Sequence, residues 1–122
     1  MSSAVYRGYH GRAGGGLVTV ERRGITRELR QYVRHSPCGF SWGYDGSGPS
    51  ELARCILIDH FGLHDAAEHD PHLDPPVDYL RFRAECVAQW TWPSEPGSEP
   101  TWLFSGRMIE EWIALHARSD AA

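Results

Sequence analysis

The chain has 122 residues, of which 41% are hydrophobic and 11% aromatic, with a formal net charge of −4 and a pI near 5.9. This length suits one domain, residues 1–122, with enough apolar surface for a core. The acidic balance argues against binding to a nucleic-acid backbone. The longest apolar run, Cys55–Ile58, is far shorter than the roughly 20 residues that span a membrane, and the first residues lack a signal pattern. We therefore expect a cytoplasmic protein without a membrane partner.

Strand patterns occupy the first part of the chain. Three strands separated by glycine-containing turns are predicted at residues 4–11, 17–23 and 25–29. Val18 and Val20 fall on one face of the second strand. Residues 39–42 are interpreted as a fourth short strand, which would place Phe40 and Trp42 on one face.

Helix patterns dominate after residue 48. Gly48 is the predicted cap of a first helix, Pro49 is its first residue, and the helix ends near Gly62. This helix is apolar on nearly every side, Arg54 excepted, so we expect it to be buried. The remaining segments are predicted as a polar connection at 63–76, a helix starting at 74–76, a loop at 91–100, an extended segment at 101–104 and a last helix capped by Ser105.

The order of these elements, strands first and helices second, predicts an α+β fold. We expect an antiparallel sheet of three to five strands, with about three helices packed on one of its faces. In the last helix Ile109, Trp112, Ile113 and His116 follow the helical spacing of an apolar stripe.

The stretch from His35 to Pro49 combines glycines, prolines and aromatic residues directly before the buried helix. Its glycines let another molecule approach the main chain. The helix leaves its first N–H groups unpaired, and its N-terminus carries about half a positive charge. Backbone groups at Gly46, Ser47, Gly48 and Ser50 are therefore predicted to hold an anion such as phosphate. The alternative is a tight strand-to-helix corner without a ligand.

Side chains of the same stretch complete the predicted site. Tyr44 or Trp42 would stack on a base. The polar side chains predicted to contact the ligand are Arg34, His35, Ser36, Asp45 and Ser47. We expect non-catalytic binding of a small phosphorylated or nucleotide-like molecule, with no cofactor and no metal. A homo-oligomer is a further expectation, because small domains often complete pockets at interfaces.

The segment from His35 to Leu57 resembles the signature of a phage- and bacterium-borne family known as domain of unknown function 6166, whose pattern is H-S-P-x-G-F-x-W-G-Y-x-G-S-G-P followed by an aliphatic helix. A Tyr-x-x-Phe helix and a closing tryptophan segment would correspond to residues 79–82 and 102–112. The resemblance implies a shared fold and an origin in a phage or mobile element, hence a place in the bacterial host cytosol. By analogy, such a protein would sequester a nucleotide immune signal.

Two other functions fit the same residues. His35 as a base oriented by Asp45 would make a small hydrolase. Alternatively, the glycine-rich stretch is purely structural and the protein inhibits a host protein by surface contact. All twelve basic residues are arginine, so enzymes that need a P-loop or Schiff-base lysine are excluded. The nucleophile-elbow pattern G-x-S-x-G also fails around Ser47.

The histidines and cysteines of the chain are potential metal ligands, but their patterns favour other interpretations. The histidines at 60, 64, 69 and 72 lie among acidic residues, and His60 and His64 have the spacing of zinc ligands. Gly62 interrupts the helix between them, so a solvated acidic linker is the preferred interpretation. Cys38, Cys55 and Cys86 form no C-x-x-C pair and are interpreted as reduced structural thiols.

Overall fold

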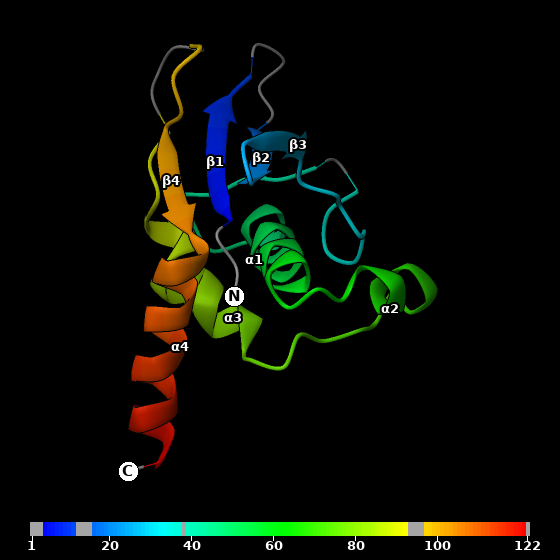
Figure 1. Cartoon of the computed structure of the whole chain (residues 1–122), viewed down its shortest axis with the longest axis vertical. Coiled ribbons are helices and arrows are strands. Elements are labelled where there is room, and N and C mark those ends of the chain that lie inside the picture. Colours follow the sequence, from blue (N-terminus) through cyan, green and yellow to red (C-terminus); the bar gives the residue numbers. More distant parts are fainter. Residues whose placement is uncertain (1–3, 12–15, 38, 93–96, 122) are drawn as a thin grey trace.

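The computed structural model contains a four-stranded antiparallel sheet with helices on one face, which confirms the predicted α+β fold (Figure 1). The strands, in the sheet order β3-β2-β1-β4, are β3 Ile25–Glu28, β2 Gly16–Arg22, β1 Val5–His10 and β4 Trp102–Ser105. The helices are α1 Ser47–His60, α2 His64–His69, α3 Tyr79–Glu85 and α4 Gly106–Ala121, with a 3₁₀ turn, η1, at Val87–Gln89. The structure describes residues 4–11, 16–37, 39–92 and 97–121.

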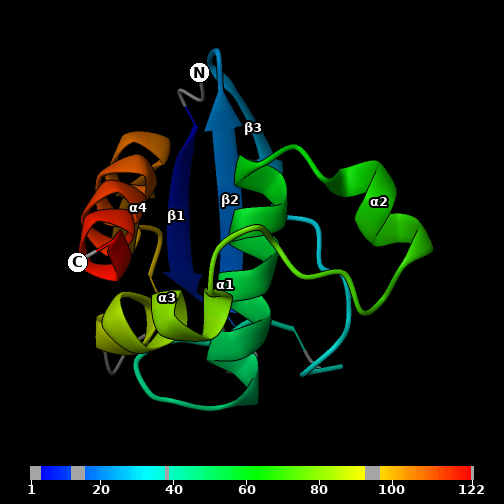
Figure 2. The same cartoon turned by 90° about the horizontal axis from the view of Figure 1, so that it is seen from below.

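The first three strands form as predicted. Side chains of β1 and β2 alternate between a buried and a more accessible face, whereas all four residues of β3 are exposed. On the buried face Tyr6 pairs with Val20 and Phe104, and Gly8 pairs with Val18. The extended segment at 101–104 becomes β4 and completes the sheet. Figure 2 views the sheet from the side that α1 covers.

A close approach of two strands depends on Gly8. A Cβ atom at this position would lie 2.0 Å from Nε1 of Trp102, whose ring packs over β1. The same indole stacks on Trp90 at 3.9 Å between ring centroids and meets Trp42 edge-on at 5.6 Å. The ring therefore has little room to move away from a larger residue.

We expect Gly8→Ala to cost about 1–3 kcal/mol of the free energy of unfolding, because the added methyl group overpacks this aromatic cluster. Gly97→Ala is the matched control, since a Cβ at Gly97 meets no atom within 4 Å, and we expect its effect to stay within about 0.5 kcal/mol. Urea unfolding followed by tryptophan fluorescence measures both changes. Equal costs for the two variants would contradict the assigned packing.

Helix α1 is the centre of the fold and is buried from Gly48 to Asp59. It begins at Ser47 and is preceded by Gly46, two residues earlier than the predicted cap at Gly48. Its end agrees with the prediction: the helix stops at His60, and Gly62 takes a left-handed φ of 66°. The buried part includes three charged residues, Glu51, Arg54 and Asp59, none of which is more than 6% exposed.

The predicted strand at 39–42 is wrong. This segment makes a single isolated bridge, between Phe40 and Gly16, and Phe40 and Trp42 are nevertheless both buried. Gly39 and Gly43 take left-handed φ angles of 102° and 84°, which interrupt an extended chain at both ends of the segment. The aromatic side chains reach the core from irregular backbone instead.

Two helix boundaries also differ from prediction. Helix α2 lies inside the segment expected to be a connection, and only Ala67 of its residues is buried. Helix α3 starts at Tyr79 rather than at 74–76, because Asp78 caps it by accepting the amides of Leu80 and Arg81, both at 3.1 Å. The predicted last helix forms as α4, with the hydroxyl of Ser105 accepting the amide of Met108.

Two of the three thiols lie in described parts of the chain. Cys55 and Cys86 are free, and burial raises the pKa of Cys55 to about 12 and that of Cys86 to about 11. Neither is a thiolate at neutral pH, so neither is a reactive nucleophile. Cys38 lies outside the described residues. Among the described helices, none combines the length and hydropathy that a bilayer crossing requires.

Candidate functional site at the start of helix α1

The glycine-rich stretch forms the entry to α1. Gly46 stands before the helix in an extended conformation, and no side chain caps the first turn. Its carbonyl oxygen accepts two hydrogen bonds, from the amide of Ser50 at 3.0 Å and from the Ser50 hydroxyl at 2.7 Å. The amides of Ser47 and Gly48 donate to no acceptor among the described residues. The positive end of the helix dipole therefore keeps two N–H groups without a partner.

An arginine from another helix lies beside this helix end. Arg83 of α3 donates from Nε to Asp45 Oδ1 at 3.1 Å and from Nη1 to the Ser50 hydroxyl at 2.9 Å. The side chain of Arg83 is 25% exposed and that of Asp45 is 62% exposed. The guanidinium of Arg83 therefore lies beside the positive end of the α1 dipole. Both features attract an anion.

The side chain of Tyr44 lies against Gly46 and Gly48, the glycines predicted to let a ligand approach the main chain. A Cβ at Gly46 would lie 2.6 Å from the Tyr44 ring, and one at Gly48 would lie 3.2 Å from its hydroxyl. These glycines therefore make room for the protein's own side chain. The Tyr44 side chain remains accessible, because the residue is 50% exposed.

Trp42 does not have the predicted role. The residue is fully buried, its ring stacks on Trp92 at 4.2 Å, and its Nε1 donates to the carbonyl of Thr91 at 3.0 Å. Burying a large indole whose N–H has a partner is the usual arrangement in a core. Of the two rings predicted to stack on a base, Tyr44 is thus the accessible one.

The second group of predicted residues, at 34–36, is held by a buried carboxylate. Glu51 accepts the backbone amides of Arg34 and His35 at 2.9 to 3.1 Å and the side-chain amide of Gln31 at 2.9 Å. The Ser36 carbonyl accepts from the same Gln31 amide group at 2.6 Å. Glu51 is fully buried, so this carboxylate fixes the loop directly against the first turns of α1.

His35 and Arg34 face α3 and the segment before it. His35 Nε2 lies 2.7 Å from the Tyr79 hydroxyl in a hydrogen bond, and Arg34 donates to Asp74 at 2.6 Å. Burial lowers the pKa of His35, and neighbouring arginines lower it further. The imidazole is therefore neutral at neutral pH.

The hydrolase pair is not formed. His35 is hydrogen-bonded to Tyr79 and Glu51, whereas Asp45 is hydrogen-bonded to Arg83. A general base needs an orienting group within hydrogen-bond reach, and Asp45 does not provide one here.

Sequence reasoning missed Tyr79 and Arg83 as parts of this region. They stand four residues apart on α3 and so share one helix face, which packs against the start of α1. That spacing is visible in the sequence, but the helix is predicted to start at 74–76, three to five residues before its observed start. Arg54 was noted without a role: its guanidinium donates to the carbonyls of Tyr32, Leu73 and Pro71.

The four clustered histidines separate in space. His60 pairs with Glu110, His64 bonds Asp59 and Tyr32, His69 bonds the Asp65 carbonyl, and the backbone amide of His72 donates to Asp70. In the described part of the chain, no three histidine, cysteine or acidic side chains come together as a metal-binding group.

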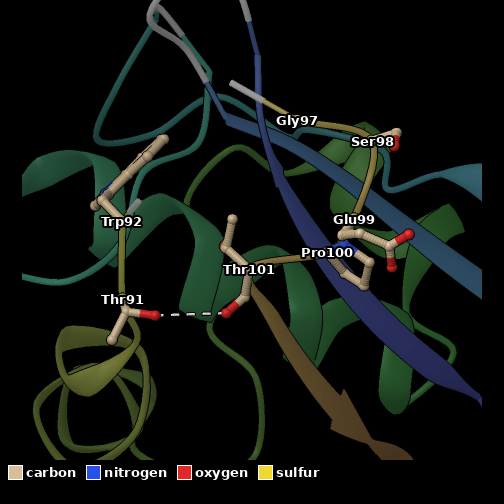
Figure 3. Close-up of a pocket in the computed structure, with 7 residues that line it drawn as sticks. All are labelled: Thr91, Trp92, Gly97, Ser98, Glu99, Pro100 and Thr101. Atoms are coloured by element: carbon tan, nitrogen blue, oxygen red, sulfur yellow. Dashed lines mark hydrogen bonds between the residues drawn. The ribbon is translucent and has the colours of Figure 1, made fainter. Parts of the chain in front are cut away.

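A cavity of about 560 Å³ lies between Thr91 and Trp92 on one side and residues 97–101 on the other (Figure 3). The hydroxyl of Thr91 and the carbonyl of Thr101, 3.5 Å apart, join the two sides. The cavity contains none of the sequence-predicted site residues in its lining.

Comparison with known proteins gives one match. No curated protein and no solved structure matches the chain. The model of the family described as "Family of unknown function (DUF6166)" matches residues 6–115, which include all four strands apart from one residue and most of the helical segments. The chain belongs to this family, as its sequence signature indicated.

Proposed function

We propose that the protein binds a small phosphorylated or nucleotide-like molecule at the first turn of α1 without turning it over. The observation that carries this proposal is the position of Arg83, whose guanidinium bonds Asp45 and Ser50, the residues on either side of the amides of Ser47 and Gly48, for which the described residues supply no acceptor. In a phage or other mobile element, such a protein would act against host defence by sequestering a nucleotide signal.

The anion would replace a weak internal partner. Asp45, which now accepts from Arg83, is mostly exposed, and an exposed ion pair contributes about 0–1 kcal/mol. A phosphate group offers more acceptor oxygens and would also reach the amide of Ser47. The exchange leaves the guanidinium satisfied and adds hydrogen bonds to the helix end.

The flat part of the ligand would lie on Tyr44. This ring is held against the first turn of α1 and is half exposed. Stacking of a base on an aromatic ring contributes about 1–3 kcal/mol in nucleic-acid complexes. The hydroxyl of Ser47 and the carboxylate of Asp45 would add polar selection beside the ring.

Calorimetry with cyclic dinucleotides and ADP-ribose tests the proposal. We expect one of these ligands to bind with no chemical change, and Arg83→Gln to weaken its binding at least about tenfold, or about 1.4 kcal/mol. Tyr44→Ala and Ser47→Ala should weaken it as well. The control is Arg107→Gln on α4, which removes an equal charge from an exposed position. Equal affinity in the Arg83 and Arg107 variants would contradict the proposed site.

A second candidate function is inhibition of a protein partner by surface contact. The exposed strand β3 favours it, since all four of its residues are exposed at the edge of the sheet. Failure of every nucleotide in the calorimetric panel, together with binding of a defined partner, would favour this function.

A further inference from the structure

Strand β3 ends the sheet with an unpaired backbone edge. In the β2–β3 ladder Val20 faces Arg27 and Arg22 faces Ile25, and the next residue, Leu29, donates its amide to the Val18 carbonyl at 2.9 Å. In an antiparallel pair, every second residue turns its N–H and C=O toward the partner strand. The backbone N–H of Leu29 points toward β2, so the N–H and C=O groups of Ile25 and Arg27 point toward β2 as well. The N–H and C=O groups of Thr26 and Glu28 therefore point outward.

Two arginines that bond no side chain or carbonyl group in the described part of the chain flank this edge. Most described arginine side chains pair with a carboxylate: Arg7, Arg22, Arg30, Arg34, Arg81, Arg83 and Arg107. Arg54 binds carbonyl groups instead. Arg23 and Arg27 have no hydrogen bond or ion pair to any described residue.

These two arginines border a shallow apolar depression. A cavity of about 210 Å³ is formed by both of them together with Val20, Arg22 and Ile25. Ile25 is 59% exposed and Val20 forms the buried floor. An extended segment lying along β3 would place alternate side chains over this depression, within reach of both guanidinium groups.

We propose that the edge of β3 binds an extended, acidic segment of a protein partner as a fifth strand of the sheet. The outward N–H and C=O groups of Thr26 and Glu28 supply the main-chain hydrogen bonds. Arg23 and Arg27 select for acidic side chains on the face that they share with Ile25. A small anion would satisfy the arginines but would leave the alternating backbone donors and acceptors unpaired.

The same charges disfavour a second copy of the chain as the occupant. Two antiparallel copies of β3 that use both outward-facing residues would pair Thr26 with Glu28 and Glu28 with Thr26. This register places Arg27 directly opposite Arg27 of the other copy, and like charges opposite one another destabilise a strand pair. Charged residues on short edge strands commonly prevent such self-pairing, and here they leave the edge open to a strand of opposite charge.

The test uses a capped seven-residue peptide that alternates valine and glutamate, with the valine–lysine peptide of the same length as its control. Calorimetry should detect saturable binding of the glutamate peptide, weakened by salt, and no binding of the lysine peptide. Arg27→Glu should weaken binding at least about tenfold, while the charge-matched Arg107→Glu should not. Absence of glutamate-peptide binding to the wild-type protein would overturn the proposal.

A second pair of variants tests the strand geometry. Thr26→Pro removes an outward N–H and leaves the β2–β3 hydrogen bonds intact, so it should abolish peptide binding, whereas Thr26→Val should preserve it. Unchanged binding to the proline variant would overturn the fifth-strand arrangement. Sedimentation of the protein without peptide should give the same mass for the wild type and both variants. If the wild type and Thr26→Val were dimers and Thr26→Pro a monomer, the strand at this edge would instead come from a second copy of the chain.

Discussion

Glu51→Ala should lower the free energy of unfolding by about 2–4 kcal/mol, because each amide donor left without an acceptor costs about 1–3 kcal/mol and a buried side chain is lost. The fully buried carboxylate accepts the amides of Arg34 and His35 and the side chain of Gln31. Without it these partly buried donors lose their acceptor, and a cavity opens beside α1. Chemical denaturation measures the loss.

Glu68→Ala is the control for this variant. Glu68 is also paired with an arginine, Arg30, but both side chains are about half exposed, so its removal should cost no more than about 1 kcal/mol. Hydrogen exchange adds a local readout: the amides of Arg34 and His35 should lose protection in Glu51→Ala and keep it in Glu68→Ala. Similar stability losses in the two variants would contradict the assigned role of Glu51.

Asp59→Asn should be comparably destabilising, by about 3–5 kcal/mol. Asp59 receives hydrogen bonds from the Tyr6 hydroxyl at 2.6 Å, from both terminal nitrogens of Arg22 and from His64 at 2.8 Å. In Asp59→Asn an NH₂ group would replace one of the two accepting oxygens and would face hydrogen-bond donors instead of accepting from them. Asp74→Asn is a closely matched control, since Asp74 lies at the same 2.6 Å from its arginine but is 66% exposed rather than 5%. That control should lose at most about 1 kcal/mol.

The contribution of Asp59 should depend on pH. Burial alone would raise its pKa, but the hydrogen bonds from Arg22, Tyr6 and His64 outweigh burial, and the net pKa lies below its ordinary value. In the unfolded chain the group takes up a proton near pH 3.9, before it does so in the folded protein. The stabilisation is thus complete above that pH and is lost as the pH falls toward the folded pKa. The stability gap between wild type and Asp59→Asn should narrow below about pH 4. A gap that widens there would show that the carboxylate is not stabilised as described.

The parts of the fold that the sequence predicts are those with a local cause. Strands β1 and β2 follow from alternation, and β3 follows from the turn at Gly24. Helix α1 ends at His60, just before Gly62, which takes a left-handed conformation. Helix α2 has no such signal, because only one of its six residues is buried. The predicted start of α3 at 74–76 is too early, because Asp78 is the residue that caps the helix, whereas the Asp74 carboxylate binds Arg34, forty residues away in sequence.

The candidate site divides in the same way. The sequence locates the glycine-rich entry to α1 and the accessible ring of Tyr44, since both depend on adjacent residues. It does not place Arg83, which meets Ser50 across 33 positions of the chain, nor does it show that Glu51 anchors a loop 16 and 17 residues earlier. Trp42 could not be assigned correctly because alternation gives the face of a ring but not its burial.

The most direct test of the central claim follows the backbone amides of the ¹⁵N-labelled protein by NMR during titration with ADP-ribose and with cyclic dinucleotides. We predict that one of these ligands shifts the resonances of Ser47 and Gly48 most strongly, and that Arg83→Gln suppresses these shifts while Arg107→Gln does not. Resonances of Ser47 and Gly48 that stay in place while the ligand binds elsewhere, or that respond to no ligand of the panel, would contradict the account.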